Sequence, residues 1–201
     1  IPINLKEVKP EFLLTVPALT ANFMNKIKEG VKEKGSFIYS VFERGLKAGN
    51  KLNNDGINKP GLFVRLWNYF PYKIASILIY RKLKMIFGGE LQYMVGGGAL
   101  LDIKQQQFYY AIGSPVFQGY GLTEASPIIS ANTPHTYKLG TSGKMLDNIT
   151  CRFMVDENRE AAKGEIGELV IKGENVMKGY YKNSKATEKT LKDGWLWTGN
   201  H

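Results

Sequence analysis

Apolar residues near the start of the chain recur at steps of three and four, the spacing of one helix face. The positions concerned are Val16, Leu19, Phe23, Ile27 and Val31. This spacing predicts an amphipathic helix, and the residues at its ends agree: Pro17 suits a first helical turn and Gly35 follows the last one.

Two further helical regions follow. The first begins at Ser36, carries Phe37, Val41 and Leu46 on one side, and continues until the turn-like residues 49–61 interrupt it. The second spans residues 62–87. Because proline lacks an amide hydrogen and its ring crowds the preceding turn, we expect this region to bend or break near Pro71.

Residues 91–120 have the pattern of a strand, a helix and a second strand. The compact apolar run "LQYMV" predicts a strand, a glycine turn follows, a helix spans about Leu100–Ile112 and ends at Gly113, and "PVFQGY" predicts the second strand. Such a unit makes its two strands parallel. The turns "GGGAL" and "GYGLTE" then lie at the carboxyl ends of the strands, where open α/β sheets bind ligands.

From about residue 137 the pattern changes to short β segments, "LGTSG", "ITCRFMV" and "EIGELVIKG", of which the last alternates apolar and polar residues. We therefore predict a mixed α/β fold: a parallel βαβ sheet with flanking helices, followed by a small antiparallel barrel or curled sheet. The predicted domains are residues 1–135 and 136–201.

Composition and charge narrow the class of protein. The net charge of +9 points weakly to anionic partners, and lysines at helical spacing are more typical of solvated faces. The apolar run at residues 74–80 is too short for a membrane span. A single cysteine, Cys151, excludes an internal disulfide framework and a zinc site of several thiolates, and we interpret it as a small apolar strand residue.

Other familiar motifs fail on their spacing. "GTSGK" at residues 140–144 lacks the Walker glycine, because Lys138 stands there, and Met145 replaces the required Ser or Thr, so a turn is predicted. The histidines, His135 and His201, are too isolated to indicate a catalytic triad or a metal site.

Four motifs carry a resemblance to a known family. They are "GGGAL" at 96–100, "QGYGLTEAS" at 118–126, "GEIGELVIKGENVMKGYYKN" at 164–183 and "DGWLWTGN" at 193–200. In this order and spacing they resemble the later core motifs of adenylate-forming (AMP-binding) enzymes, and long-chain acyl-CoA synthetases most of all. Residues 1–90 match more loosely.

The resemblance implies a reaction and a set of site residues. Such enzymes join a carboxylate to ATP with Mg²⁺, forming an acyl adenylate, and then transfer the acyl group to coenzyme A. By resemblance Glu124 would hold Mg²⁺, Thr123 would donate its hydroxyl to a phosphate oxygen, and Tyr120 would lie against adenine. The other nucleotide-binding residues implied are Gly97, Gly98, Ala99, Gln118, Gly119, Gly121 and Asn200. A helix-capping role for Thr123 and Glu124 is the structural alternative.

Two departures from the family's pattern limit what the resemblance implies. The last motif normally ends in an aspartate that accepts hydrogen bonds from both ribose hydroxyls, and here the residue is Asn200. The Ser/Thr/Gly-rich phosphate loop and the C-terminal domain with its catalytic lysine are also missing from these 201 residues. We therefore expect an internal fragment that is inactive alone.

The acyl substrate, the partners and the location are less strongly indicated. A long-chain fatty acid is favoured, because aromatic residues such as Phe108, Tyr109, Tyr110 and Phe117 could line an apolar tunnel, although such residues are more often core. The expected partners are fatty acid, ATP and coenzyme A, without nucleic acid; peripheral membrane contact and oligomerisation stay open. The expected location is cytoplasmic, with membrane association on that face as an alternative. Two functional alternatives remain: an adenylating ligase for another carboxylic acid, and a basic, non-catalytic module that binds membranes or polyanions.

Overall fold

The computed structural model describes residues 2–201, which fold as two compact units. Among these residues, unit 1 comprises residues 2–119 and Ala131–Lys144, and unit 2 comprises Tyr120–Ser130 and Met145–His201. The chain therefore passes between the units three times. The domain boundary after residue 135 stays a prediction.

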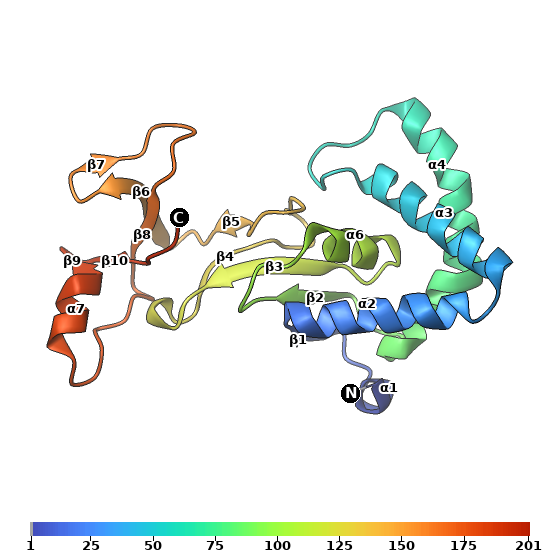
Figure 1. Cartoon of the computed structure of the whole chain (residues 1–201), viewed down its shortest axis with the longest axis horizontal. Coiled ribbons are helices and arrows are strands. Elements are labelled where there is room, and N and C mark those ends of the chain that lie inside the picture. The colour runs from blue at the N-terminus through green and yellow to red at the C-terminus, as the bar shows by residue number, and fades with distance from the viewer. Residues whose placement is uncertain (1) are drawn as a thin grey trace. The chain divides into compact units, whose positions relative to one another are not determined.

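The first half of the chain is mainly helical (Figure 1). Its elements are α1 (Pro2–Val8), β1 (Phe12–Thr15), α2 (Pro17–Lys32), α3 (Ser36–Asn53), α4 (Leu62–Ala75), the π turn η1 (Ser76–Tyr80), α5 (Arg81–Lys84) and the 3-10 turn η2 (Met85–Phe87). Among residues 2–201, no helix combines the length and apolarity needed to cross a membrane.

Helix α2 confirms the first predicted helix. Pro17 occupies its first turn, and Phe23, Ile27 and Val31 are buried on its inner face. Helix α3 differs from the prediction in two respects. It runs on to Asn53 instead of stopping near residue 49, and Phe37, expected on the apolar side, is 73% exposed. The buried face of α3 is instead centred on Phe42 and Leu46, with Gly45 and Gly49 making close contact between helices.

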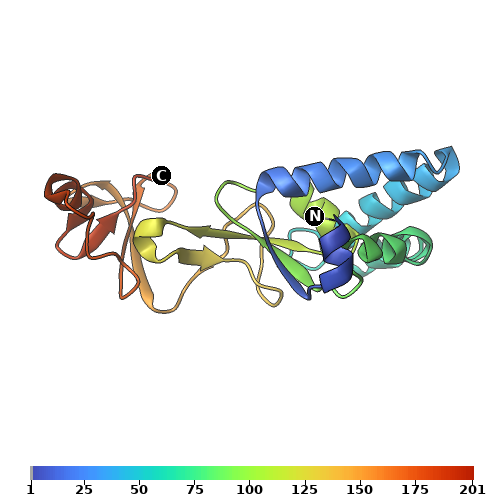
Figure 2. The same cartoon turned by 90° about the horizontal axis from the view of Figure 1, so that it is seen from below.

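The expected break at Pro71 does not occur there. Pro71 lies inside α4, and the regular α-helical pattern changes only at the π turn η1, five residues later. Helix α4 packs along α3, and the two lie side by side in Figure 1 and in Figure 2. Proline inside a helix removes a backbone hydrogen bond and destabilises an isolated helix. We infer that the packing against α3 offsets this destabilisation and keeps α4 helical through Pro71.

The βαβ unit is confirmed. It consists of β2 (Tyr93–Gly96), α6 (Ile103–Ala111) and β3 (Val116–Gly121), and β2 and β3 are parallel with Gly96 opposite Gln118. With β4 (Ile128–Ala131) and β5 (Lys144–Met145) they form a sheet in the order β1-β2-β3-β4-β5. The sequence reading missed β1, which pairs with β2 in parallel. The predicted segment 139–143 forms turns, and the β pairing begins only at Lys144.

The aromatic residues considered for a tunnel belong largely to the packed interior of unit 1. Phe108 and Tyr109 lie in the main hydrophobic cluster, and Phe117 is 4% exposed. Tyr110 is half-buried, with its ring 5.6 Å from that of Tyr137. These aromatic residues therefore belong to the core, which was the alternative to a tunnel lining.

Unit 2 contains a separate sheet in the order β7-β6-β8-β10-β9, and its neighbouring strands pair antiparallel, as predicted. Its elements are η3 (Thr123–Ala125), β6 (Ile149–Asp156), β7 (Arg159–Glu160), β8 (Glu168–Gly173), α7 (Ser184–Thr190), β9 (Leu191–Lys192) and β10 (Trp195–Trp197). A second hydrophobic cluster lies on one side of this sheet and includes Ala125, Ile129, Ile171 and Leu196. Cys151 is half-buried against it, in agreement with its interpretation as a strand residue.

Candidate functional site

The loop after β2 contains three of the predicted nucleotide-binding residues. Gly98 has a φ of +80°, a conformation that favours glycine, and a Cβ on Gly97 would meet only the Gly119 carbonyl oxygen, at 4.0 Å. Ala99 is exposed, whereas Leu101 is buried and anchors the loop. The loop thus presents backbone and small side chains at the carboxyl end of β2.

Gln118 holds this loop against β3. Its Oε1 accepts from the Leu101 amide at 2.6 Å, and its Nε2 donates to the carbonyls of Gly119, at 2.7 Å, and Ala99, at 3.3 Å. The side chain is 4% exposed, and both amide hydrogens are used. Gln118 therefore positions the loop, and a direct contact with nucleotide stays a prediction.

The turn after β3 is tightly built within unit 2. The Leu122 amide donates to the Pro127 carbonyl at 2.8 Å, and a Cβ on Gly121 would lie 1.8 Å from that carbonyl oxygen. The packing inside the turn is thus sufficient to require glycine at position 121, whether or not a ligand approaches it. Between these ends lies η3, a turn of three residues without a side-chain cap, so the helix-capping interpretation of Thr123 and Glu124 is wrong.

A neighbouring loop makes two hydrogen bonds to Glu124 and a third to Ala125, the next residue of the turn. Tyr180 donates its hydroxyl to Glu124 Oε1 at 2.8 Å, the Met177 amide donates to the Glu124 carbonyl at 2.8 Å, and Asn175 Nδ2 donates to the Ala125 carbonyl at 2.7 Å. The hydrogen bond to Glu124 raises the pKa of Tyr180, with smaller contributions from burial and from the carboxylate charge. Glu124 is half-buried and Thr123 is exposed, so both are presented from a turn that is held in place.

Tyr120, the first residue of unit 2, has its ring against the second hydrophobic cluster. Burial raises the pKa of its phenol, and the Thr198 hydroxyl partly offsets the effect. That hydroxyl is itself committed, since it donates to the Leu169 carbonyl at 2.7 Å, and the buried Tyr120 oxygen has no hydrogen bond of normal geometry among the described residues. A buried, unpaired hydroxyl is costly to a fold and is the kind of group that a ligand can satisfy.

Asn200 is exposed at the end of the last motif. Its Nδ2 donates to the Thr198 carbonyl at 2.9 Å, and its backbone amide donates to the Thr198 hydroxyl at 3.2 Å. The Leu169 amide donates to its carbonyl at 2.8 Å, which ties the residue to β8. The donor half of the Asn200 side chain is thus engaged locally, while the acceptor oxygen is the group available to a ligand.

The residues around Glu124 fit a magnesium ion better than a transition metal. Among residues 2–201, no three His, Cys, Asp or Glu side chains are grouped so that they could hold a metal ion. Mg²⁺ does not need such a cage, because it keeps several waters and binds through one or two carboxylates together with substrate phosphates. One presented carboxylate is therefore a suitable donor set for Mg²⁺ that arrives with a nucleotide.

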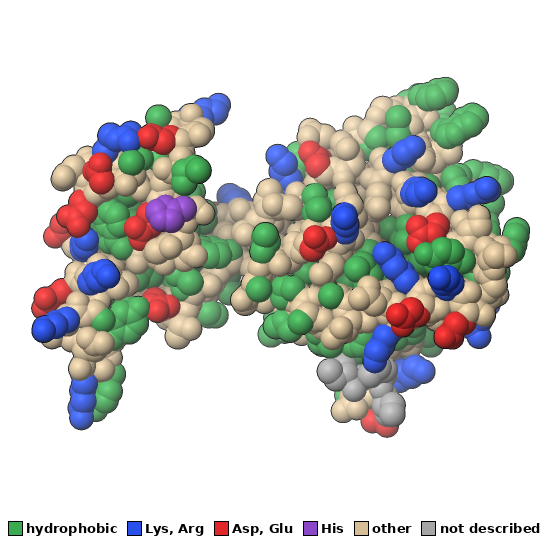
Figure 3. Space-filling model, viewed as in Figure 1, with side chains coloured by type: hydrophobic (Ala, Val, Ile, Leu, Met, Phe, Trp, Pro, Cys, Tyr) green, Lys and Arg blue, Asp and Glu red, His purple; other side chains and the backbone are tan. Residues whose placement is uncertain are grey.

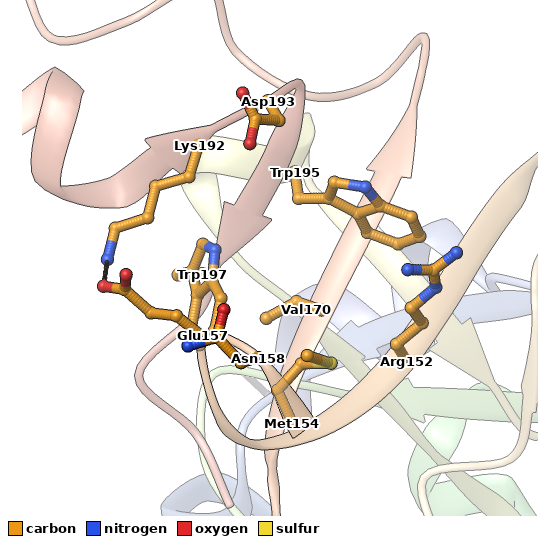
Figure 4. Close-up of a pocket in the computed structure, with 9 residues that line it drawn as sticks. All are labelled: Arg152, Met154, Glu157, Asn158, Val170, Lys192, Asp193, Trp195 and Trp197. Carbon is orange, nitrogen blue, oxygen red and sulfur yellow. Dashed lines mark hydrogen bonds and ion pairs between the residues drawn. The ribbon is translucent and has the colours of Figure 1, made fainter. Parts of the chain in front are cut away.

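A separate pocket of unit 2 lies on the outer face of its sheet (Figure 4). It measures about 320 Å³, and Val170 lies between Trp195 and Trp197 in the close-up. Its cations already have partners: the Arg152 guanidinium stacks 4.6 Å from the Trp195 ring, and Lys192 pairs with Glu157. None of the predicted site residues lines this pocket, so it lies apart from the candidate site.

The structure therefore places the predicted residues in two groups, one in each unit. Gly97, Gly98, Ala99, Gln118 and Gly119 belong to unit 1, and the other predicted residues belong to unit 2. Sequence reasoning missed Asn175, Tyr180 and Thr198 as supporting residues. All three lie inside motifs that carried the resemblance, and that membership was the signal that could have found them.

Comparison with known proteins supports the same family. The family of AMP-binding enzymes matches residues 3–181. Long-chain-fatty-acid–CoA ligase 1 of Saccharomyces cerevisiae is 34% identical over 98% of this chain and 27% of its own length. This chain spans between 23% and 30% of the length of the curated relatives considered.

Solved structures agree on the fold. A long-chain-fatty-acid–CoA ligase from Archaeoglobus fulgidus matches 98% of this chain and 32% of its own, with a TM-score of 0.60 and 21% identity, which shows the fold alone. O-succinylbenzoate coenzyme A synthetase from Bacillus subtilis, in complex with ATP and magnesium ion, is 32% identical over 55% of this chain and 23% of its own, with a TM-score of 0.50.

Proposed function

Because this chain belongs to the AMP-binding enzyme family, we propose that it is part of a ligase that activates a fatty acid with ATP and then forms the coenzyme A thioester. In the first step a carboxylate oxygen of the acid attacks the α-phosphorus of ATP, and pyrophosphate leaves. In the second step the thiol sulfur of coenzyme A attacks the acyl carbon, and AMP leaves. Both steps follow the ligase names of relatives that match nearly the whole chain.

The observation that carries the proposal is the immobilised turn with Glu124. Three hydrogen bonds from Asn175, Met177 and Tyr180 hold an otherwise exposed polar turn in one conformation. Adenylate formation needs such fixed groups, because its main barrier is charge at a crowded phosphate, which preorganised donors and cations stabilise.

Each residue of the turn has a distinct role under this proposal. Thr123 donates its hydroxyl to a phosphate oxygen, and Tyr120 offers its ring to adenine and its unpaired hydroxyl to a polar group. Glu124 holds magnesium, which when bound neutralises charge on the phosphates. Asn200 accepts one hydrogen bond from ribose, and the Gly97–Ala99 loop lets the nucleotide approach the backbone closely.

The proposed acid is a long-chain fatty acid, following the names of the relatives from Mycobacterium bovis and Saccharomyces cerevisiae. We also propose peripheral contact with the cytoplasmic face of a membrane, because each methylene of a long acyl chain favours the bilayer by about 0.8 kcal/mol. Activation of another carboxylic acid is the second candidate, and the likeness to the o-succinylbenzoate synthetase favours it over a non-catalytic module.

Fatty-acid-dependent exchange between ATP and pyrophosphate tests the proposal in the protein that carries this chain. We expect Glu124→Gln to lower the exchange rate about a hundredfold, since it removes a fixed charge from the phosphate site. Thr123→Val should lower it less, because one neutral hydrogen bond is lost. Glu174→Gln, at an exposed carboxylate of the same unit, is the matched control.

A panel of acids in the same assay identifies the substrate. Exchange that depends on palmitate supports the long-chain assignment, whereas exchange with aromatic acids alone supports the second candidate. Exchange that Glu124→Gln leaves unchanged would contradict the role of this turn.

A further inference from the structure

Tyr180 connects Glu124, the proposed magnesium ligand, to helix α7, which contains none of the predicted site residues. Its hydroxyl donates to Glu124 Oε1 at 2.8 Å, and the Met177 amide of the same loop donates to the Glu124 carbonyl at 2.8 Å. The loop therefore holds both the side chain and the backbone of one residue. A phenol has a single hydrogen to donate, so Tyr180 engages one carboxylate oxygen and leaves Oε2 to a metal ion.

The backbone of Tyr180 is in turn fixed by α7. Its amide donates to the Thr187 hydroxyl at 2.9 Å, and that hydroxyl donates to the Asn183 carbonyl at 2.9 Å. Asn183 caps the helix, because its Oδ1 accepts from the Ala186 amide at 3.1 Å. One hydroxyl thus joins the first turn of α7 to the residue that donates to Glu124.

The contact between this loop and α7 is close. Gly179 has a φ of +145°, and a Cβ there would lie 2.8 Å from the Thr187 Cγ2 and 3.0 Å from its Oγ1. A larger residue would push the loop away from Thr187, so glycine at this position preserves the hydrogen bond to the Tyr180 amide. Because every residue involved belongs to unit 2, the arrangement does not depend on what covers the surface of that unit.

Surface charge alone does not draw cations to this region. Helix α7 carries Lys185, Glu188 and Lys189, and in Figure 3 basic and acidic side chains are interspersed over the region that α7 occupies in Figure 1. The long side chain of a glutamate loses conformational entropy when it is fixed. Binding of a cation by Glu124 therefore depends on whether its carboxylate is already oriented, and the hydrogen bond from Tyr180 orients it.

We propose that Tyr180 and Thr187 are positioning residues that hold the Glu124 carboxylate in one orientation and thereby set how strongly magnesium supports nucleotide binding. The assignment rests on the proposed function, because Glu124 has there the role of magnesium ligand. Both residues act through Glu124: Thr187 holds the Tyr180 backbone, and Tyr180 holds the carboxylate. Without the Tyr180 hydroxyl, the carboxylate has several conformers and must be ordered when the metal binds.

Calorimetric titration with ATP at several magnesium concentrations tests this positioning in the protein that carries the chain. In the parent protein we expect magnesium to strengthen ATP binding. Tyr180→Phe should lower this strengthening about tenfold and leave ATP affinity without magnesium unchanged. Thr187→Val should lower it about threefold, because the Tyr180 amide loses one neutral hydrogen bond. Thr187→Ser keeps the hydroxyl and should retain the parent's value.

Two controls separate positioning from a general effect on the fold. Tyr181→Phe is the matched control, since Tyr181 is the adjacent tyrosine and is 88% exposed, and it should leave the magnesium effect unchanged. In a Glu124→Gln background, Tyr180→Phe should change nothing further, because it acts through that carboxylate. Circular dichroism verifies that each variant is folded.

Tyr180→Phe would overturn the positioning role if it weakened ATP binding equally with and without magnesium, or if it had no effect. A further loss in the Glu124→Gln background would overturn it as well. The proposed function is judged separately. A parent protein that shows no exchange with any acid of the panel contradicts that function, whereas exchange that depends on Glu124 and not on Tyr180 contradicts the positioning alone.

Discussion

At the scale of single residues, the amide at position 200 separates this chain from its family's pattern. Asn200 uses its Nδ2 in a hydrogen bond to the Thr198 carbonyl, so it offers a ligand one acceptor oxygen where an aspartate would offer two. Ribose has two hydroxyls to bind. The residue therefore limits nucleotide affinity under the proposed function.

We predict that Asn200→Asp tightens ATP binding about fivefold, because one further hydrogen bond contributes about 1 kcal/mol. Isothermal titration with ATP and magnesium measures it. Asn200→Ala is the control and should weaken binding. If both substitutions leave the affinity unchanged, the side chain does not contact ribose.

A second residue-scale prediction concerns the ion pair between Arg159 and Glu165, which joins their side chains through two hydrogen bonds of 2.8 and 2.7 Å. The Arg159 guanidinium, with the Ala162 amide, lowers the pKa of Glu165 to about 2 from its ordinary value of 4.5. Because the folded pKa is the lower one, the pair stabilises the fold above pH 4.5, and this contribution is lost as pH falls towards 2.

Thermal unfolding followed across this range should show a smaller loss of stability in Glu165→Gln than in the parent chain. Because the ion pair is exposed to solvent, the difference in stability between Glu165→Gln and the parent chain should be small and sensitive to salt. Glu174→Gln serves as the control and should keep the parent's pH dependence. The same pH dependence in Glu165→Gln would contradict the assignment.

Thr123 and Glu124 stay predicted site residues, and the residues that support them in the structure were not predicted. Thr123 and Glu124 stood out because a short motif brings them together. Gln118 is predicted to bind nucleotide, and its hydrogen bonds to Leu101 and Ala99 depend on the pairing of two strands, which a local pattern does not contain. The bond from Tyr180 to Glu124 spans 56 positions and likewise requires the tertiary fold.

At the scale of elements, the close contact between α3 and α4 depends on glycine. A Cβ at Gly45 would lie 2.2 Å from the Ala75 Cβ and 2.5 Å from the Tyr80 hydroxyl. We predict that Gly45→Ala lowers the free energy of unfolding by about 1 to 3 kcal/mol, because the helices must separate to admit the methyl group. Urea denaturation measures the change.

Gly30→Ala is the matched control for this prediction. Gly30 lies in α2, and a Cβ there would meet nothing within 4 Å. Since alanine favours the helix over glycine, this change should raise the free energy of unfolding by about 0.5 to 1 kcal/mol. Stabilisation of both variants by the same amount would show that helix propensity, and not contact, decides at position 45.

Elements with a long periodic pattern were predicted well, whereas some short elements that depend on their neighbours, such as β1, were missed. Helix α2 repeats its apolar spacing over four turns, so tertiary contacts reinforce what the local pattern already favours. Strand β1 has four residues and no alternation, and it exists because β2 pairs with it. The helical region was expected to bend or break near Pro71 on local grounds, but α4 continues through Pro71 while it packs against α3.

At the scale of the whole molecule, two separate hydrophobic clusters belong to the two units. We predict that Ile171→Ala, at a fully buried position of unit 2, lowers the free energy of unfolding of that unit by about 2 to 5 kcal/mol. Amide hydrogen exchange in unit 1 should stay unchanged. Met94→Ala, at a fully buried position of unit 1, should show the reverse. Uniform loss of protection in both variants would mean that the units unfold as one.

The threefold passage of the chain between the units limits how the molecule can be divided genetically. Residues 145–201, expressed without the rest, would lack Ala125 and Ile129, which are fully buried in the second hydrophobic cluster. They would also lack the turn whose carbonyls bind Asn175 and Met177. Unit 2 is thus encoded in two separated stretches of gene, and an insertion or deletion between them alters the spacing that both units share.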